Sequence, residues 1–337
     1  MGWAAVQIST MAIVVLITLS YSRRDMLVGL RNGFTYASKL VALGVTIVFI
    51  ILTTDQIWTF RFVAWTLTIL GIPPTLFFIF SIPEVKLSKE AVVYNKKYSA
   101  MNEMGHTVMM EKEKEEIISK TWKDWLKSGN FYIHAIVYTL ARMAVSVTMT
   151  LTPFYVIHVL GFEFDKKASV SLEIALVPLV SYASSMIFSI FFYNWMVNIF
   201  GNRIHPLFIG MVLTVGSSIP FYFMQPSFAW LIFILVAIQG IGLSIILNIA
   251  TSLISDVIGK DDKSSAFVFG VYGLVEKLIN GILLVVIGNT VIQNEAWLRW
   301  LASALPAGCA FLTYIFAFIG KTCYADEMKN PSRNSLK

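Results

Sequence analysis

Residues 228–254 read FAWLIFILVAIQGIGLSIILNIATSLI, a run of apolar and small side chains that contains no charged residue. About 20 predominantly apolar residues are enough for an α-helix to cross the roughly 30 Å of hydrocarbon in a bilayer. The whole chain shares this character, because its 337 residues are 57% hydrophobic and only 14% charged. Soluble domains contain about 25% charged residues. The sequence therefore predicts an integral membrane protein.

Further apolar windows of similar length predict an all-α, multi-pass protein with about nine transmembrane helices. A long polar stretch at 83–129 separates three predicted spans from six. We therefore expect a partial N-terminal bundle at 1–82, a cytosolic central loop at 83–129, a six-helix bundle at 130–320 and a cytosolic tail at 321–337. The predicted spans are 3–20, 34–53, 61–82, 131–160, 168–198, 204–224, 228–254, 265–291 and 297–320.

The end of the central loop is apolar and aromatic, with Ile117, Ile118, Trp122, Trp125 and Leu126. Such a segment could lie along the membrane surface as an interfacial helix. It could equally be a helical lead-in to the next span, and the sequence leaves both interpretations open.

The distribution of basic residues predicts the orientation of the spans. If the connecting segments alternate between the two sides, 20 of the 26 Lys and Arg residues fall on one side and 4 on the other. Short cytosolic loops are enriched in Lys and Arg, so this bias predicts a cytosolic C-terminus. The net charge of +6 does not indicate a nucleic-acid partner, because the basic residues lie in short loops instead of on one aromatic face.

A charged pair, Glu276 and Lys277, lies inside an apolar stretch of helical length. Ionisable groups at membrane depth are costly unless they face a cavity or a partner, so they indicate a solute or ion pathway. Adjacent residues point about 100° apart on a helix, so we expect the two side chains to have separate partners. Asn280 lies one turn away and shares their surroundings. Lys277 could bind a carboxylate or replace a cation, and the alternative is a structural ion pair with another helix.

Arg142 lies about eleven residues into its predicted span, or roughly 16 Å along the helix. Its guanidinium could bind a substrate carboxylate through two hydrogen bonds, or it could pair with Glu276. Asn248 and Gln239 share another span but lie about 180° apart, so only one can face a central cavity. We expect Asn248 to be that residue.

Several motifs resemble the glycoside-pentoside-hexuronide cation-symporter branch of the major facilitator superfamily. Asp256-Val-Ile-Gly, Ser265-Ala-Phe-Val-Phe-Gly and Glu276-Lys-Leu-Ile-Asn-Gly are similar to its tenth-to-eleventh helix region. Within the branch, the likeness is greatest to an animal group that imports cysteine into lysosomes and melanosomes. Gly2-Trp-Ala with Gln7-Ile-Ser is similar to the fourth helix of that group, and Leu30-Arg31 with Phe34-Thr35 to the fifth. Tyr138 with Arg142 is similar to the seventh helix, and Ile174-Ala with Pro178-Leu and Tyr182 to the eighth.

The resemblance implies a fold of two helical bundles in which helices four to twelve are present here and helices one to three are not. It also matches Lys277 to a lysine of the eleventh helix. Two motifs depart from the family pattern. Ile17-Thr-Leu replaces Pro-Glu-Leu, and Asn198-Ile-Phe-Gly201-Asn-Arg203 replaces Asp-x-x-Gly-x-Arg. The second change removes a charge, so we expect a weaker charge lock between helices.

The residues expected at the gate and its loops are Asp256, Arg203, Gly201 and Arg31. Asp256 lies near the cytosolic end of its helix, where Lys260, Asp261, Asp262 and Lys263 follow. We therefore expect Asp256 to join a gate network instead of binding solute.

The function predicted from these features is secondary transport of a small polar solute, an amino acid such as cysteine, by alternating access. The coupling ion would be a proton or sodium, and the membrane would be endolysosomal or the plasma membrane. Two alternatives remain: a sugar-cation symporter, favoured if Tyr272 or Trp195 lines the cavity, and a truncated membrane scaffold that does not transport. No catalytic motif is present, so we expect no enzyme activity, cofactor or metal.

Overall fold

The computed structural model describes residues 2–18, 20–53, 55–81, 121–161, 172–258, 262–290 and 294–323. These residues form helices joined by short connections, and none of them lies in a β-strand. Eight of the helical segments are long and apolar enough to cross a membrane. The all-α, multi-pass architecture expected from the sequence is therefore confirmed.

The first three helices differ in length from the predicted spans. They are α1 (Gly2–Ile17), α2 (Tyr21–Leu52) and α3 (Gln56–Ser81). The described part of α1 has 16 residues, shorter than the other spans, which accounts for a count of eight where about nine were expected. Helix α2 begins well before the predicted start of its span, so Arg31 lies within a helix and not in a loop.

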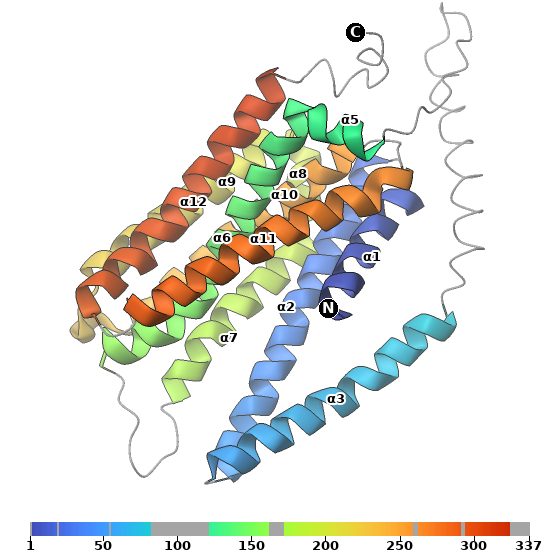
Figure 1. The fold of residues 1–337 in the computed structure, drawn as a ribbon. Helices are drawn as coiled ribbons and strands as arrows, with labels where there is room; N and C mark the ends of the chain where they lie inside the picture. Colours follow the sequence, from blue (N-terminus) through green and yellow to red (C-terminus); the bar gives the residue numbers. More distant parts are fainter. Residues whose placement is uncertain are drawn as a thin grey trace, which may run out of the picture.

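The second part of the chain is a bundle of long helices (Figure 1). Proline residues lie inside several of these helices, where neighbouring segments can satisfy the backbone groups that proline leaves free. A π-helical turn, η1, interrupts the span that begins as α7 and ends as α8. The elements are α6 (Gly129–His158), α7 (Leu172–Ile187), η1 (Phe188–Phe192), α8 (Tyr193–Phe200), α9 (Ile204–Phe223), η2 (Pro226–Phe228), α10 (Leu231–Ile258), α11 (Asp262–Thr290) and α12 (Glu295–Cys323).

A short helix, α5 (Trp122–Lys127), precedes α6 and is separated from it by Ser128. Its start is fixed by the Asp124 carboxylate, which accepts a hydrogen bond of 2.9 Å from the backbone N–H of Thr121. Trp125 is buried against Phe131 of α6. The apolar end of the central loop is therefore a separate helical turn and not a continuous extension of α6. The rest of that loop, together with the tail beyond Cys323, lies outside the described residues.

Helix α10 is the most deeply buried span and packs against α6, α7 and α9. Small residues bring these helices close together. A Cβ atom on Gly240 would lie 2.6 Å from the Ser181 carbonyl oxygen of α7, and one on Gly242 would lie 2.5 Å from the Thr214 hydroxyl of α9. Close approach of this kind is typical of packing between membrane helices, where small residues increase van der Waals contact.

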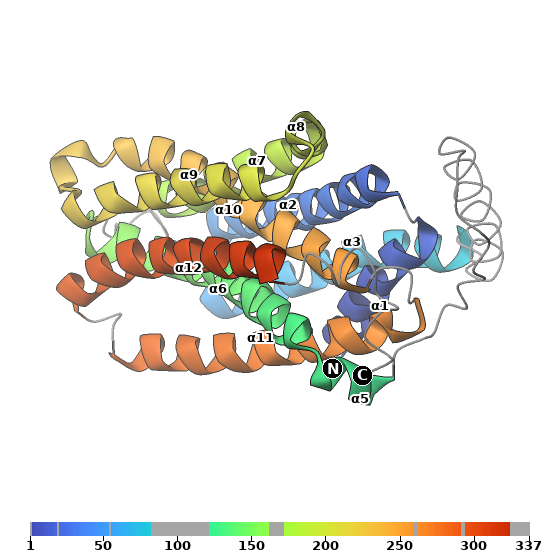
Figure 2. The same cartoon turned by 90° about the horizontal axis from the view of Figure 1, so that it is seen from above.

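Helix α2 joins the first part of the chain, helices α1 to α3, to the second part, helices α6 to α12. It packs against α7, η1 and α10, whereas α1 packs against α11 (Figures 1 and 2). Gly29 and Gly33 make this approach possible, because a Cβ atom on either would collide with the η1 backbone or with Ile190. Helix α3 packs against α2 and leaves most of its large apolar side chains exposed. The central polar residues therefore lie where α1 and α2 meet the second bundle.

Candidate functional site

A chain of polar side chains crosses the molecule from α11 through α1 to α6. The Lys277 ammonium donates to the Gln7 side-chain oxygen at 3.1 Å, and the Gln7 amide donates to the Tyr138 hydroxyl at 3.3 Å. Arg142 completes the series by donating from Nε to the same hydroxyl at 3.1 Å. Residues that are far apart in the sequence thus form one connected polar group, here called the central site, at the meeting point of the two parts of the chain.

Glu276 and Lys277 form an ion pair with a separation of 2.9 Å. The expectation that these neighbours could not pair is therefore wrong. Their Cα–Cβ bonds do diverge, but the four methylene groups of lysine are long enough to bring its ammonium back across the helix surface. Asn280 adds a hydrogen bond of 3.2 Å to the other carboxylate oxygen of Glu276. The carboxylate is thus held by a cation and an amide from its own helix.

The two members of this pair differ in exposure. The Glu276 side chain is 8% exposed and that of Lys277 is 31% exposed. The side-chain oxygen of Asn280 is buried and has no hydrogen-bond donor within the described residues. A buried carboxylate beside a spare buried acceptor and a more accessible ammonium can exchange a proton or a small cation, or can release Lys277 to an anionic ligand.

Arg142 is only partly buried and contacts Tyr138 in two ways. It donates a hydrogen bond to the hydroxyl, and its guanidinium carbon lies 5.4 Å from the ring centroid. Glu276 stabilises its charge at longer range, without a direct ion pair between the described side chains. Of the two roles considered from the sequence, direct pairing with Glu276 is not what the structure shows. Most of the donors of Arg142 remain available for a ligand.

Asn248 lies in a tightly packed contact between helices instead of on an open surface. Its side-chain oxygen accepts from Asn32 of α2 at 2.7 Å, and its amide donates to Ser189 of η1 at 2.8 Å. Gln239, on the opposite side of α10, donates to Ser218 of α9. Both are buried, and each joins α10 to a different neighbour. The expected solute-facing role of Asn248 is therefore replaced by a role in holding α2, η1 and α10 together.

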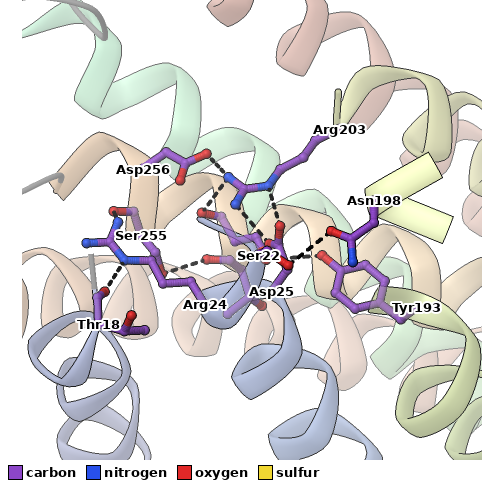
Figure 3. A network of polar contacts seen from close by, with 11 residues as sticks. Thr18, Ser22, Arg24, Asp25, Tyr193, Asn198, Arg203, Ser255 and Asp256 are labelled. Carbon is purple, nitrogen blue, oxygen red and sulfur yellow. Dashed lines mark hydrogen bonds and ion pairs between the residues drawn. The ribbon is translucent and has the colours of Figure 1, made fainter. Parts of the chain in front are cut away.

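Two of the four residues predicted for the gate, Arg203 and Asp256, belong to one charge network (Figure 3), whereas Arg31 bonds to Asn32 instead. Arg203, at the start of α9, lies 2.9 Å from a carboxylate oxygen of Asp25 in α2 and also pairs with Asp256 in α10. It donates to the backbone oxygen of Ser252 as well, at 3.4 Å. This arginine therefore connects three helices through two carboxylates. Asp25, Arg203 and Asp256 are called the charge lock below.

Two neighbouring features support the charge lock. Gly201 ends α8 with a positive φ of 57°, a conformation that glycine adopts without steric cost, and so turns the chain to bring Arg203 back to the bundle. Arg24 is 2% exposed and donates to the backbone oxygens of Thr18 and Ser255, which joins α2 to α10 beside the ion pairs (Figure 3). The turn between α8 and α9 thus depends on Gly201. The connection between α2 and α10 depends on Arg24.

The expected loss of charge at Asn198 is compensated elsewhere. Asn198 accepts a hydrogen bond of 3.0 Å from the Ser22 hydroxyl, while Asp25 supplies the carboxylate for Arg203 (Figure 3). The partners expected for Asp256 from the sequence, beginning at Lys260, lie outside the part of the chain whose side chains are described. The sequence does not single out Arg24 and Asp25, because they lie between two predicted spans, 3–20 and 34–53, in a segment expected to be a loop.

The proposed aromatic platforms for a sugar do not belong to the central site. Tyr272 is completely buried among Phe131 and Tyr138 and donates to the Phe131 carbonyl oxygen at 2.6 Å. Trp195 is 63% exposed on the outer surface of α8. Neither residue presents a free ring face to the polar chain. Gln7 was not predicted as a site residue, although it lies in a motif that carried the family resemblance.

The apolar spans, the central site and the charge lock together define a multi-pass helical membrane protein of the major facilitator type. A family model described as "MFS/sugar transport protein" matches residues 1–312. The match covers nearly the whole chain, and the chain therefore belongs to this family.

Three relatives share the name "Major facilitator superfamily domain-containing protein 12". The Mus musculus protein is 22% identical over 305 residues, which cover 85% of this chain and 59% of the relative. The Equus caballus protein is 26% identical over 166 residues, or 49% of this chain and 33% of the relative. The Homo sapiens protein is also 26% identical over 166 residues, or 49% of this chain and 32% of the relative. The chain thus matches less than two thirds of the length of each relative.

Proposed function

We propose that this protein is a secondary transporter that carries a small polar solute, an amino acid such as cysteine, across a membrane by alternating access. The observation that carries the proposal is the central site, which joins α1 of the first part to α6 and α11 of the second. Transporters of this architecture place their substrate between two bundles that rock against each other. A solute that binds along this hydrogen-bonded chain can replace the contacts across the boundary, so that the two bundles can move apart.

Lys277 and Arg142 give the proposed site its preference for a carboxylate. Both present N–H donors, both are partly exposed, and Tyr138 with Gln7 spaces them apart. Guanidinium and ammonium groups bind carboxylates through charge-assisted hydrogen bonds, which are stronger than those between neutral groups. A neutral sugar would leave Arg142 without a counter-ion and Lys277 with Glu276 alone. An amino acid carboxylate therefore suits these residues better than sugar hydroxyls, in agreement with the cysteine-importing group that the sequence resembles.

Glu276 is the proposed site of ion coupling. In the deprotonated form its carboxylate holds Lys277 at 2.9 Å and accepts from Asn280. Binding of a proton or a sodium ion at this carboxylate would weaken its hold on Lys277 and free the ammonium for the solute carboxylate. Solute binding and ion binding would then favour the same conformation, which is the requirement for symport.

The test is uptake of radiolabelled L-cysteine into liposomes that contain the purified full chain. We expect Lys277→Ala and Arg142→Ala to lower uptake at least tenfold, because each removes a charge-assisted hydrogen bond to the carboxylate. Arg61→Ala is the matched control, since Arg61 is exposed on α3 and its guanidinium carbon lies 5.1 Å from the Trp58 ring centroid. All three variants should insert equally into the liposomes. Unchanged uptake by both central variants would overturn the assignment of this site.

The same preparation tests the coupling. We expect an imposed proton or sodium gradient to accelerate uptake by the wild-type chain, and we expect Glu276→Gln to remove that acceleration while Arg61→Ala retains it. Equal acceleration in Glu276→Gln and in the wild-type chain would exclude this carboxylate as the coupling site.

A further inference from the structure

A second group of cations lies on α2, beside the central site. Arg31 and Lys39 come from the middle of α2, where Tyr36 packs in one cluster with Ala144 and Val145 of α6, close in sequence to Arg142. The Lys39 ammonium lies 5.6 Å from the ring centroid of Tyr36 and 5.3 Å from that of Tyr182. Three cations from two helices on opposite sides of the bundle boundary therefore converge on one region.

This concentration of positive charge has no matching carboxylates. Among the described residues, no Asp or Glu lies within ion-pair distance of Arg31, Lys39 or Arg142. Arg31 donates a hydrogen bond of 3.2 Å to a neutral acceptor, the side-chain oxygen of Asn32. All three cations are partly exposed, so a small molecule can reach them. Uncompensated like charges at membrane depth are costly and are expected where a counter-ion binds.

Tyr36 supplies an independent observation at the same place. Its side chain is 2% exposed, yet its hydroxyl is buried without a hydrogen-bond partner within the described residues. The Lys39 ammonium lies over the ring of this tyrosine, which places it in the same cluster. A buried hydroxyl without a partner costs free energy, and an acceptor atom of a bound ligand would remove that cost.

The depth of the cluster identifies the kind of anion. Lys39 is separated from both ends of α2 by at least roughly 20 Å along the helix, which is too far for lipid headgroup phosphates to reach easily. Glu276, the carboxylate beside the central site, is already held by Lys277 and Asn280, so it is a poor partner for a ligand ammonium. The cluster therefore suits a small soluble anion better than a lipid or a cation.

We propose that Arg31, Lys39, Arg142 and the Tyr36 hydroxyl form a binding site for a carboxylate or sulfonate group, and that the preferred solute carries a net negative charge. The inference rests on the proposed transport function and names its substrate class. The solute spans two positions that share Arg142: one anionic group lies between Arg142 and Lys277, and the second lies between Arg142, Arg31, Lys39 and the Tyr36 hydroxyl.

The probe is a set of three related compounds: L-cysteate with a carboxylate and a sulfonate, L-cysteine with a carboxylate alone, and cysteamine, which lacks the carboxyl group, with neither. Equilibrium binding to the purified full chain in lipid nanodiscs is measured by isothermal titration calorimetry. We expect L-cysteate to bind most tightly, L-cysteine at least tenfold more weakly, and cysteamine not at all, since each lost anion removes charge-assisted hydrogen bonds.

Variants separate this site from general effects on the protein. We expect Arg31→Gln and Lys39→Gln to weaken L-cysteate binding at least tenfold and L-cysteine binding much less, because only L-cysteate has the second anionic group. Tyr36→Phe, which removes a single oxygen atom, should weaken L-cysteate binding severalfold. Arg61→Gln is the matched control and should bind all three compounds as the wild-type chain does. Should a glutamine variant not fold, Tyr36→Phe and the charge-conserving Lys39→Arg still test the site.

The outcomes distinguish this inference from the proposed function. Equal affinity for cysteamine and L-cysteate, or unchanged L-cysteate affinity in Lys39→Gln and Tyr36→Phe, would overturn the anion site even if L-cysteine uptake is normal. Tight L-cysteate binding that depends on Lys39, with no uptake of any of the compounds into liposomes, would support the anion site and overturn the transport proposal.

Discussion

The charge lock and the central site use buried charges in opposite ways. In the charge lock, Arg203 faces two carboxylates, and Asp25 on one side of it is almost completely buried. In the central site, Glu276 has one cation, while Arg142 and its neighbours on α2 have no carboxylate within ion-pair distance among the described residues. The cation near the end of the bundle is thus paired with carboxylates, whereas positive charge at the centre is in excess.

The difference indicates different roles. A buried ion pair with complete partners holds helices in one arrangement, and the loss of one partner is costly. An excess of one charge in a partly exposed position is stabilised only when a ligand of opposite charge arrives. We therefore interpret the charge lock as the element that keeps one end closed and the central site as the element that recognises the solute. The following predictions test this division.

Removal of Arg203 should have the largest effect on stability. Arg203→Ala leaves Asp25 and Asp256 facing each other without a cation, and breaking a buried ion pair in this way costs about 3–5 kcal/mol. The measurement is the free energy of unfolding, or the melting temperature, of the purified chain in detergent. Arg61→Ala serves as the control, because Arg61 is exposed.

A triple variant sharpens this prediction. Asp25→Asn and Asp256→Asn in the Arg203→Ala background remove the two unpaired carboxylates, so part of the lost stability should return. If Arg203→Ala melts at the wild-type temperature, the charge lock does not hold the helices together. If the triple variant is no more stable than the single one, the carboxylates are not the source of the loss.

Removal of Lys277 should destabilise the protein less. Lys277→Met retains the aliphatic part of the side chain but leaves Glu276 without its ammonium partner, although Asn280 still donates to it. We expect a loss of about 1–3 kcal/mol, the usual cost of an unsatisfied buried polar group. Lys277→Met with Glu276→Gln should be nearly as stable as the wild-type chain and still fail to transport. A stability loss as large as that of Arg203→Ala would mean that the central site is mainly structural.

The sequence predicted the membrane class and most of the spans, because apolar length is a property of local sequence, and the roles of Lys277 and Arg142 stay predictions. It did not predict which distant side chains meet. Asp25 replaces the charge missing at Asn198 although the two residues belong to different helices, and Gln7 lies between Lys277 and Tyr138 only because α1 packs against α11. Such contacts depend on tertiary packing, which no helical periodicity specifies.

Asn248 offers a smaller test of the same division, because its contacts are neutral. Asn248→Leu removes hydrogen bonds to Asn32 and Ser189 that join three elements. Hydrogen bonds between membrane helices contribute about 0.6 kcal/mol on average, so we expect a loss of about 1 kcal/mol in the free energy of unfolding. L-cysteine affinity should be unchanged, since Asn248 is completely buried and its partners, Asn32 and Ser189, are not residues of the central site. A tenfold loss of affinity with normal stability would return Asn248 to the solute site.

The smallest effect is expected at an exposed ion pair. Glu295 accepts hydrogen bonds of 3.0 and 2.9 Å from Arg299 one turn later on α12, and the Glu295 side chain is 56% exposed. Exposed pairs at this spacing contribute about 0.3–0.5 kcal/mol, so Glu295→Gln should barely change the melting temperature and should leave uptake intact. The same Glu→Gln change at 276 is predicted to abolish coupling, so the two variants compare one chemical change at an exposed and a buried position. If both variants behaved alike in stability and uptake, burial could not be what separates functional charges from incidental ones in this protein.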